Sequence, residues 1–238
     1  MGNTINSKRD EIYEWLLEEA EEDYKKFASS LLPGVDNLLG VRIPTIRKKA
    51  KQLVKEDVVA YLNEIGEDYF EEIMLKGFLI AQAKWTVEER IHWIRLHIPK
   101  LSNWSLCDSF CSSLKEAKKE KKIYWELVEE YLRKDSEYEL RFAIVMILQY
   151  FLNPLYSEKI FQYFDNINKE NYYVRKYYVH MAIAWAISIC YKYNKTETME
   201  YLKNNQLYDH TYNKAIQKIL ELKNIETEEK IQLKKMKR

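Results

Sequence analysis

Residues 177–191 read YYVHMAIAWAISICY and form the longest apolar run of the chain. The run is shorter than the roughly 18 residues that a membrane span needs, and it contains a histidine. A stretch that is apolar nearly all round predicts a helix covered by protein on every side. Residues 141–152, RFAIVMILQYFL, show the same pattern. The two stretches therefore predict buried inner helices.

Composition extends the helical prediction to the whole chain. Only 5 glycines and 4 prolines occur among 238 residues, of which 14% are aromatic and 32% charged. Turn signals stand at Pro33-Gly34, Pro44 and Asn153-Pro154. Between such signals, periodicity predicts helices at 6–28, 44–55, 57–64, 67–83, 86–98, 103–117, 121–133, 137–152, 156–165, 171–193, 196–204, 209–223 and 227–236.

The order of these helices suggests a repeat architecture. More polar helices, such as 121–133 and 156–165, alternate with the apolar ones in units of roughly 35–45 residues. This layout is typical of an all-α solenoid of HEAT-like repeats, and an ordinary helical bundle is the alternative. We expect a single domain over residues 1–238, with a basic C-terminal tail at about 226–238.

Charge and cysteine usage limit the classes of partner and compartment. The formal net charge is +1, so a nucleic-acid or membrane partner would have to meet a local patch. The 3 cysteines form no CxxC pair, and the 4 histidines show no metal-ligand spacing. The N-terminus lacks a signal-peptide pattern. The chain is therefore expected in the cytoplasm, without a metal and without a membrane.

One predicted helix carries an unexpected carboxylate. Residues 101–111 read LSNWSLCDSFC, in which Trp104 and Asp108 are four apart and share a helix face. Asn103 is a plausible N-cap, so Asp108 lies too deep in the helix to act as a cap. Aspartate is unfavourable at such a position. The simplest alternative is an exposed aspartate beside a half-buried tryptophan.

Two further residues depart from a plain apolar core. Arg141 begins an apolar inner helix, and Trp185 lies between alanines in another. Arg141 follows Asp108 by 33 residues, and Trp185 follows Arg141 by 44, which is about one repeat each. Equivalent positions of successive inner helices line one surface of a solenoid, so these side chains and Trp104 could meet in one groove. A structural salt bridge and a core tryptophan are the alternatives.

Basic residues suggest a rim for phosphates. In residues 40–53, GVRIPTIRKKAKQL, apolar side chains form one stripe of the predicted helix and basic ones form another. Such a row can neutralise phosphates, although most charge runs are only solvated faces. The candidate phosphate-contacting residues are Arg42, Arg47, Lys48, Lys51, Arg175 and Lys176.

Four stretches carry a resemblance to a known family. They are GVRIPTIRKKAK, SNWSLCDSF, ELRFAIVMIL and YYVHMAIAWA, in this order. Together they resemble the bacterial DNA alkylation repair glycosylases built from HEAT-like repeats, the alkylpurine DNA glycosylase D family. The likeness runs from about residue 10 to 225. It implies a C-shaped solenoid that cups duplex DNA and removes N3- and N7-alkylated purines.

The resemblance also implies roles for single residues. Asp108 matches the family's catalytic aspartate, Trp104 the tryptophan one turn before it, and Arg141 and Trp185 the arginine and last tryptophan of later inner helices. A base alkylated at N3 or N7 is cationic and leaves readily, so no general acid is needed. A fixed carboxylate can stabilise the positive charge that develops on the sugar and can orient water. We expect no cofactor, a monomer, and alkylated double-stranded DNA as the partner.

Two other function classes stay open at this point. The same groove could bind DNA or RNA structure without catalysis, or the solenoid could be a protein–protein scaffold. A scaffold gains nothing from a carboxylate and an arginine directed into a groove, which disfavours the scaffold reading. Only an excision assay separates the enzyme from a non-catalytic nucleic-acid binder.

Overall fold

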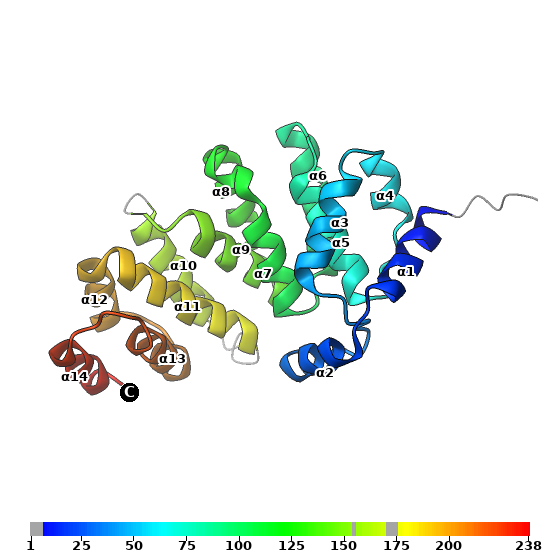
Figure 1. The fold of residues 1–238 in the computed structure, drawn as a ribbon. Helices are drawn as coiled ribbons and strands as arrows, with labels where there is room; N and C mark the ends of the chain where they lie inside the picture. Colours follow the sequence, from blue (N-terminus) through cyan, green and yellow to red (C-terminus); the bar gives the residue numbers. More distant parts are fainter. Residues whose placement is uncertain (1–6, 154–155, 170–175) are drawn as a thin grey trace, which may run out of the picture. The chain divides into compact units, whose positions relative to one another are not determined.

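The computed structural model describes residues 7–153, 156–169 and 176–238, and every regular element in these ranges is helical (Figure 1). The chain divides into two compact units, Met1–Glu116 and Ala117–Arg238. The first holds α1 Lys8–Glu18, α2 Glu22–Leu31, α3 Ile43–Leu53, α4 Val58–Glu64, α5 Phe70–Gln82, α6 Val87–His97, the 3₁₀ turn Ile98–Lys100 and α7 Trp104–Ser113. After the 3₁₀ turn Lys115–Lys118, the second holds α8 Lys121–Tyr131, α9 Glu137–Tyr150, α10 Ser157–Lys169, α11 Tyr177–Tyr193, α12 Lys195–Lys203, α13 Asp209–Leu220 and α14 Thr227–Lys235. The prediction of an all-helical fold is confirmed.

Helix α5 forms the centre of the first unit. It packs against α3 on one side and α7 on another, and α4 and α6 also contact it. Its residues 70–80 are all buried, as expected for a helix covered on every side. Gly77 permits the close approach of its neighbours, because a Cβ there would lie 2.8 Å from Nε2 of His97 and 3.2 Å from the Phe110 ring.

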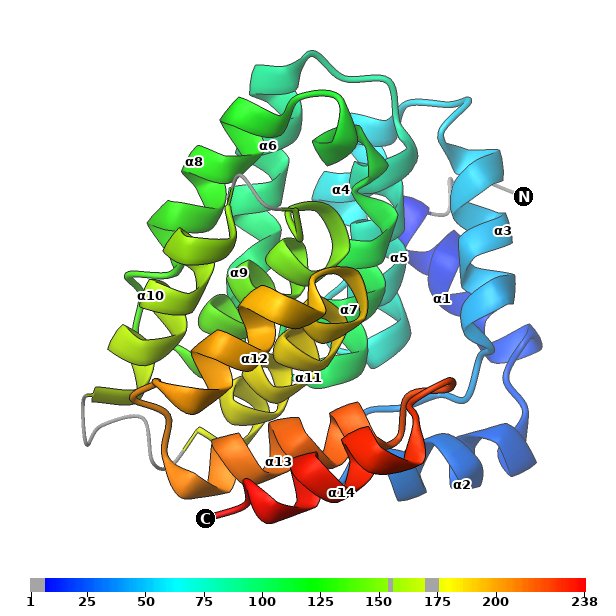
Figure 2. The same cartoon turned by 90° about the vertical axis from the view of Figure 1, so that its left-hand side faces the viewer.

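The second unit repeats this plan. Helices α9, α11 and α13 pack in series, with α8 against α9, α12 against α11 and α14 beside α13 (Figure 2). The two apolar stretches of the sequence fall in α9 and α11, whose side chains are largely buried. This confirms both predicted inner helices. Alternate helices packed in series are typical of a helical-repeat solenoid; the groove and the single domain stay predictions.

The predicted helix 6–28 is wrong, because the structure places two helices there. α1 ends at Glu18, and Glu21 is extended with φ −118° and ψ 119°. Its N–H donates to the carbonyl of Gly40 at 3.0 Å. Gly40 has φ +104°, and a Cβ on it would lie only 2.7 Å from the Glu21 carbonyl oxygen. A distant segment thus takes the hydrogen bond that a continuous helix would have used.

A buried carboxylate holds that segment in place. Glu71, in the first turn of α5, is fully buried. Its Oε1 accepts hydrogen bonds from the backbone N–H groups of Gly40 at 2.8 Å and Val41 at 3.2 Å, and its Oε2 accepts one from Leu39 at 3.0 Å. Buried N–H groups require partners, so Glu71 fixes the entry into α3.

The predicted basic tail is a folded element. Residues 227–235 form α14, which buries Leu233. The last residue, Arg238, places its guanidinium 4.1 Å from the ring centroid of Tyr212 on α13, and its backbone N–H donates to Asn213 at 2.9 Å. These contacts secure the C-terminus to α13.

A buried histidine predicts how the stability depends on pH. Burial lowers the pKa of His97 from 6.5 to about 3, and the nearby Lys76 ammonium acts in the same direction. In the unfolded chain the His97 imidazole therefore binds a proton below pH 6.5, whereas in the folded chain it binds one only near pH 3. This contribution to stability is complete above pH 6.5 and is lost as the pH falls.

We expect the wild-type chain to lose about 1 kcal/mol more of its unfolding free energy between pH 6 and pH 5 than a His97→Gln variant does. Urea titrations of both proteins at the two pH values measure this difference. Carboxylates that titrate in both proteins contribute equally to the two losses, so their contribution cancels in the difference. Equal losses would show that His97 titrates normally.

Candidate functional site

Helix α7 presents one half-buried face that carries Trp104 and Asp108. The Oδ1 of Asn103 accepts a hydrogen bond from the backbone N–H of Leu106 at 3.0 Å, which confirms the predicted N-cap. Leu106 and Phe110, on the opposite side of the helix, are buried. Trp104 and Asp108 are only partly covered and stand four residues apart. A tryptophan ring and a carboxylate therefore share one accessible face of a well-anchored helix.

The orientation of Trp104 is set by helix α2. The indole Nε1 of Trp104 donates to the backbone carbonyl of Leu31, the last residue of α2, at 3.2 Å. The ring also lines a small apolar cavity of about 90 Å³ beside Phe27 and Phe70. Trp104 thus joins α2 to α7 while part of its ring stays accessible. Neither contact could be predicted from the LSNWSLCDSFC motif.

Arg141 is held at the point where α9 meets the beginning of α11. It is 5% exposed, and one guanidinium nitrogen donates to the backbone carbonyl of Tyr178 at 2.7 Å. Glu137, one turn before it, accepts the backbone N–H of Tyr178 at 2.7 Å. The pair thus binds both backbone groups of Tyr178. Arg141 therefore positions the first turn of α11, and its grip on a phosphate stays a prediction.

Trp185 lies on the least covered face of α11. Met181, Trp185 and Ile189 are half-buried and recur every four residues, whereas the rest of the helix between them is buried. The hydroxyl of Ser188 donates to the Trp185 carbonyl at 2.7 Å. Tyr178, two turns before Trp185, is also half-buried. The face that carries Trp185 is thus aromatic and accessible.

A small aromatic cluster accompanies Arg141 and was missed in the sequence. The Tyr178 ring centroid lies 5.8 Å from that of Tyr138 and 5.1 Å from that of Tyr177, and the Arg141 guanidinium lies 6.0 Å from the Tyr178 ring. The paired tyrosines at 177–178 and the Glu137/Arg141 spacing were the available signals.

Two of the predicted phosphate contacts already have partners. Arg42 forms a bidentate ion pair with Glu21 at 2.7 and 2.9 Å, which raises the pKa of the guanidinium and lowers that of the carboxyl. Arg47 lies over the Phe78 ring at 4.1 Å and donates to the hydroxyl of Ser113 at 2.7 Å. Burial lowers the pKa of the Arg47 guanidinium. Arg47 thereby links α3 to α5 and α7.

The other predicted phosphate contacts differ in their surroundings. Lys48 and Lys51 are exposed on α3, and neither forms an ion pair among the residues that the structure describes. Lys176 pairs with Asp135 at 2.6 Å and is only 13% exposed. Arg175 lies outside the described residues. The lysines of α3 are therefore the best-placed cations of the set.

Other site chemistries have little support in the described residues. The three cysteines are buried, and burial raises the pKa of Cys190 to about 12, which leaves that thiol unreactive. In residues 7–153, 156–169 and 176–238, no three His, Cys, Asp or Glu side chains gather as a metal site would require. Across the same ranges no helix has the length and hydropathy to cross a bilayer.

Comparison with known families favours a DNA repair enzyme over a protein–protein scaffold. The family model of DNA alkylation repair enzymes matches residues 8–219. The chain belongs to this family. It is therefore an enzyme of DNA alkylation repair whose substrate is DNA, and the resemblance seen in the four sequence stretches is confirmed. A search of curated proteins found no match.

Membership of this family makes the α7 face a candidate site for acting on DNA. The match includes the helices that carry Trp104, Asp108, Arg141 and Trp185. Within the first unit, the structure brings Trp104 and Asp108 together on α7. Within the second, it places Arg141 and Trp185 on the packed pair α9 and α11. That all four line one groove stays a prediction.

Proposed function

We propose that this DNA alkylation repair enzyme is a monofunctional glycosylase that excises cationic N3- and N7-alkylated purines from duplex DNA. The observation that carries the proposal is the accessible Trp104–Asp108 face of α7, in a chain whose family acts in DNA alkylation repair. A carboxylate in the interior of a helix, one turn after an anchored tryptophan, is suited to stabilise a cation that forms beside it.

The substrate itself supplies much of the reactivity. Alkylation at N3 or N7 makes the purine cationic, so the base leaves as a neutral molecule and needs no proton from the enzyme. When the bond between the base and C1′ breaks, its electron pair goes to the purine and positive charge moves to the deoxyribose. Asp108 stabilises this oxocarbenium-like state and orients the attacking water, whose oxygen bonds to C1′ and whose proton is released.

The tryptophans are proposed to receive the positively charged sugar. Aromatic faces attract cations by about 0.5–2 kcal/mol per ring. The Trp104 ring is held by its bond to the Leu31 carbonyl, so little side-chain entropy is lost on binding. Trp185 contributes a second accessible ring from α11. We propose that these rings and Asp108 contact the sugar-phosphate backbone, so that the base need not enter a pocket.

Arg141 is proposed to act in two ways. Its bond to the Tyr178 carbonyl positions the first turn of α11, and its guanidinium is proposed to hold a phosphate oxygen, a group that guanidinium donors bind well. We further propose that the enzyme works in the cytoplasm as a monomer and needs no cofactor. The buried free cysteines agree with a reducing compartment.

A product assay tests the proposed function. Purified protein incubated with methylated duplex DNA should release free 7-methylguanine or 3-methyladenine and leave abasic sites without breaking the strand. Chromatography of the released bases and alkali treatment of the DNA measure both products. Methyl groups removed from bases that stay in the DNA, or binding without base release, would contradict a glycosylase.

DNA binding should depend strongly on salt in spite of the +1 net charge. The logarithm of the association constant falls linearly with the logarithm of the salt concentration. If Lys48 and Lys51 each neutralise one phosphate, a Lys48→Gln/Lys51→Gln variant should make this negative slope shallower by about 1.8. Fluorescence anisotropy with an undamaged duplex at several salt concentrations measures the slope. Lys121→Gln/Lys122→Gln, which changes two exposed lysines at the start of α8, is the charge-matched control. Equal slopes for both variants would remove the α3 lysines from the interface.

A further inference from the structure

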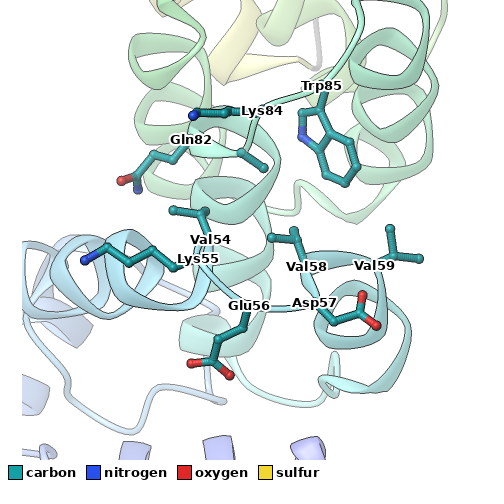
Figure 3. A pocket seen from close by; sticks show the side chains of 10 residues that line it. Val54, Lys55, Glu56, Asp57, Val58, Val59, Gln82, Lys84 and Trp85 are labelled. Atoms are coloured by element: carbon teal, nitrogen blue, oxygen red, sulfur yellow. The ribbon is translucent and has the colours of Figure 1, made fainter.

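A larger cleft lies elsewhere in the first unit, between the segments that follow α3 and α5 (Figure 3). Its volume is about 590 Å³, within the range of sites that bind small organic ligands. Residues 54–59 form one wall and residues 82–85 the other. It includes neither Trp104 nor Asp108, so it is separate from the α7 face.

One side of the cleft is apolar and carries a fixed aromatic ring. Figure 3 shows Trp85 on the same side as Val58 and Val59. The indole Nε1 of Trp85 donates to the Ile80 carbonyl at 3.0 Å, and the ring lies 6.1 Å from that of Trp93. Because these contacts hold the half-buried indole, its remaining surface can accept a planar group without much reordering.

The other side carries polar groups without partners. Lys55, Gln82 and Lys84 extend to this side in Figure 3. Both lysines are exposed, and within the described ranges neither forms an ion pair. The Gln82 Nε2 is buried and has no hydrogen-bond partner there. The side thus offers two cations to a ligand.

The two acidic residues of the cleft are already engaged. Glu56 accepts a hydrogen bond from the Tyr61 hydroxyl at 2.8 Å. Asp57 caps α4 by accepting the backbone N–H of Ala60 at 3.0 Å. Both carboxylates keep their negative charge, but these bonds fix them on the lower side of the view in Figure 3, away from Lys84 and Trp85. An anionic group would therefore be held at Lys84 and Lys55 rather than beside the carboxylates.

A row of lysines leads to the cleft. Lys48 and Lys51 are one turn apart on α3, Lys55 follows two residues after the helix ends at Leu53, and all three are exposed. A row of cations that leads to a cleft with a fixed aromatic ring is an arrangement with which proteins bind single strands of nucleic acid.

We propose that this cleft binds a nucleotide unit, with an unstacked base against Trp85 and its phosphate at Lys55 and Lys84. The row on α3 favours a nucleotide that belongs to a single strand. The activity is binding alone, and it goes beyond the proposed base excision. It would give the enzyme a second hold on DNA wherever a strand is unpaired.

Binding of a fluorescein-labelled dT10 strand to the full chain tests the proposal. A Lys55→Gln/Lys84→Gln variant should bind dT10 roughly tenfold more weakly than wild type, whereas the Lys121→Gln/Lys122→Gln control should change its affinity less than twofold. Circular dichroism verifies that both variants fold. Equal affinities of the two variants would overturn the proposal. Competition by dTMP at concentrations where dT10 is half bound would identify a free nucleotide as the ligand, and competition only by unlabelled strands would identify a strand.

A crosslink locates the bound base. A strand with one 5-iododeoxyuridine, irradiated in complex with wild type, should attach to the tryptic peptide WTVEER, residues 85–90. A crosslink found only on other peptides would place the base elsewhere and contradict the cleft. The test is independent of the proposed excision, because an Asp108→Asn variant should keep its affinity for dT10. The Lys55→Gln/Lys84→Gln variant should likewise keep single-turnover excision at saturating enzyme.

Discussion

Replacing Asp108 by asparagine should lower the single-turnover release of 7-methylguanine from duplex DNA by roughly 10²–10³-fold, the scale of losing one preorganised stabilising group. The change keeps the size of the side chain and its ability to hydrogen-bond, but it removes the negative charge that opposes the developing sugar cation. Asp108 is half-buried on the accessible face of α7, so the helix should fold normally.

Binding separates this effect from a loss of affinity. The affinity of Asp108→Asn for undamaged duplex should change little or increase, because a carboxylate repels phosphates. Asp36→Asn, which removes an exposed charge from the loop between α2 and α3, should excise at the wild-type rate. Excision by Asp108→Asn at the wild-type rate would show that Asp108 is not the catalytic group.

Replacing Glu71 by alanine should lower the free energy of unfolding by about 3 kcal/mol or more. The change leaves the buried N–H groups of Gly40 and Val41 and the part-buried N–H of Leu39 without their acceptor, and each such group costs about 1–3 kcal/mol. Glu71→Gln keeps one carbonyl acceptor and should lose less. Urea titration of both variants measures the differences.

The matched control for this prediction is Glu126→Ala, at an exposed position in α8, which should change stability by no more than about 0.5 kcal/mol. Glu71→Ala should also weaken duplex binding, because residues 39–41 lead directly into α3 and its lysines. An unfolding free energy equal to that of the Glu126→Ala control would show that water satisfies the three N–H groups.

Local patterns in the sequence predicted the elements that are specified by residues close to one another in the chain. The apolar runs of α9 and α11 specify buried helices, and Asn103 specifies the beginning of α7. The shared face of Trp104 and Asp108 follows from their spacing alone. The break between α1 and α2 does not, because it depends on Gly40, about twenty residues away, approaching Glu21.

The partners of the charged residues were harder to predict for the same reason. Helical periodicity placed Arg47 on the polar side of α3, but only the packing of α3 on α5 reveals its contacts with Phe78 and Ser113. Likewise, the hydrogen bond from Arg141 to Tyr178 joins residues 37 apart. Spacing shows which side of a helix a residue occupies, whereas its partner depends on tertiary structure.

The central claim is that the enzyme excises bases whose own positive charge makes them leave, with Asp108 stabilising the sugar cation. Single-turnover excision by the wild-type protein, measured on one duplex sequence with either cationic 7-methylguanine or neutral hypoxanthine at the same position, tests it most directly. We expect release of 7-methylguanine and no detectable release of hypoxanthine, because the chain is proposed to supply no general acid. Release of both bases at similar rates, or of neither, would contradict it.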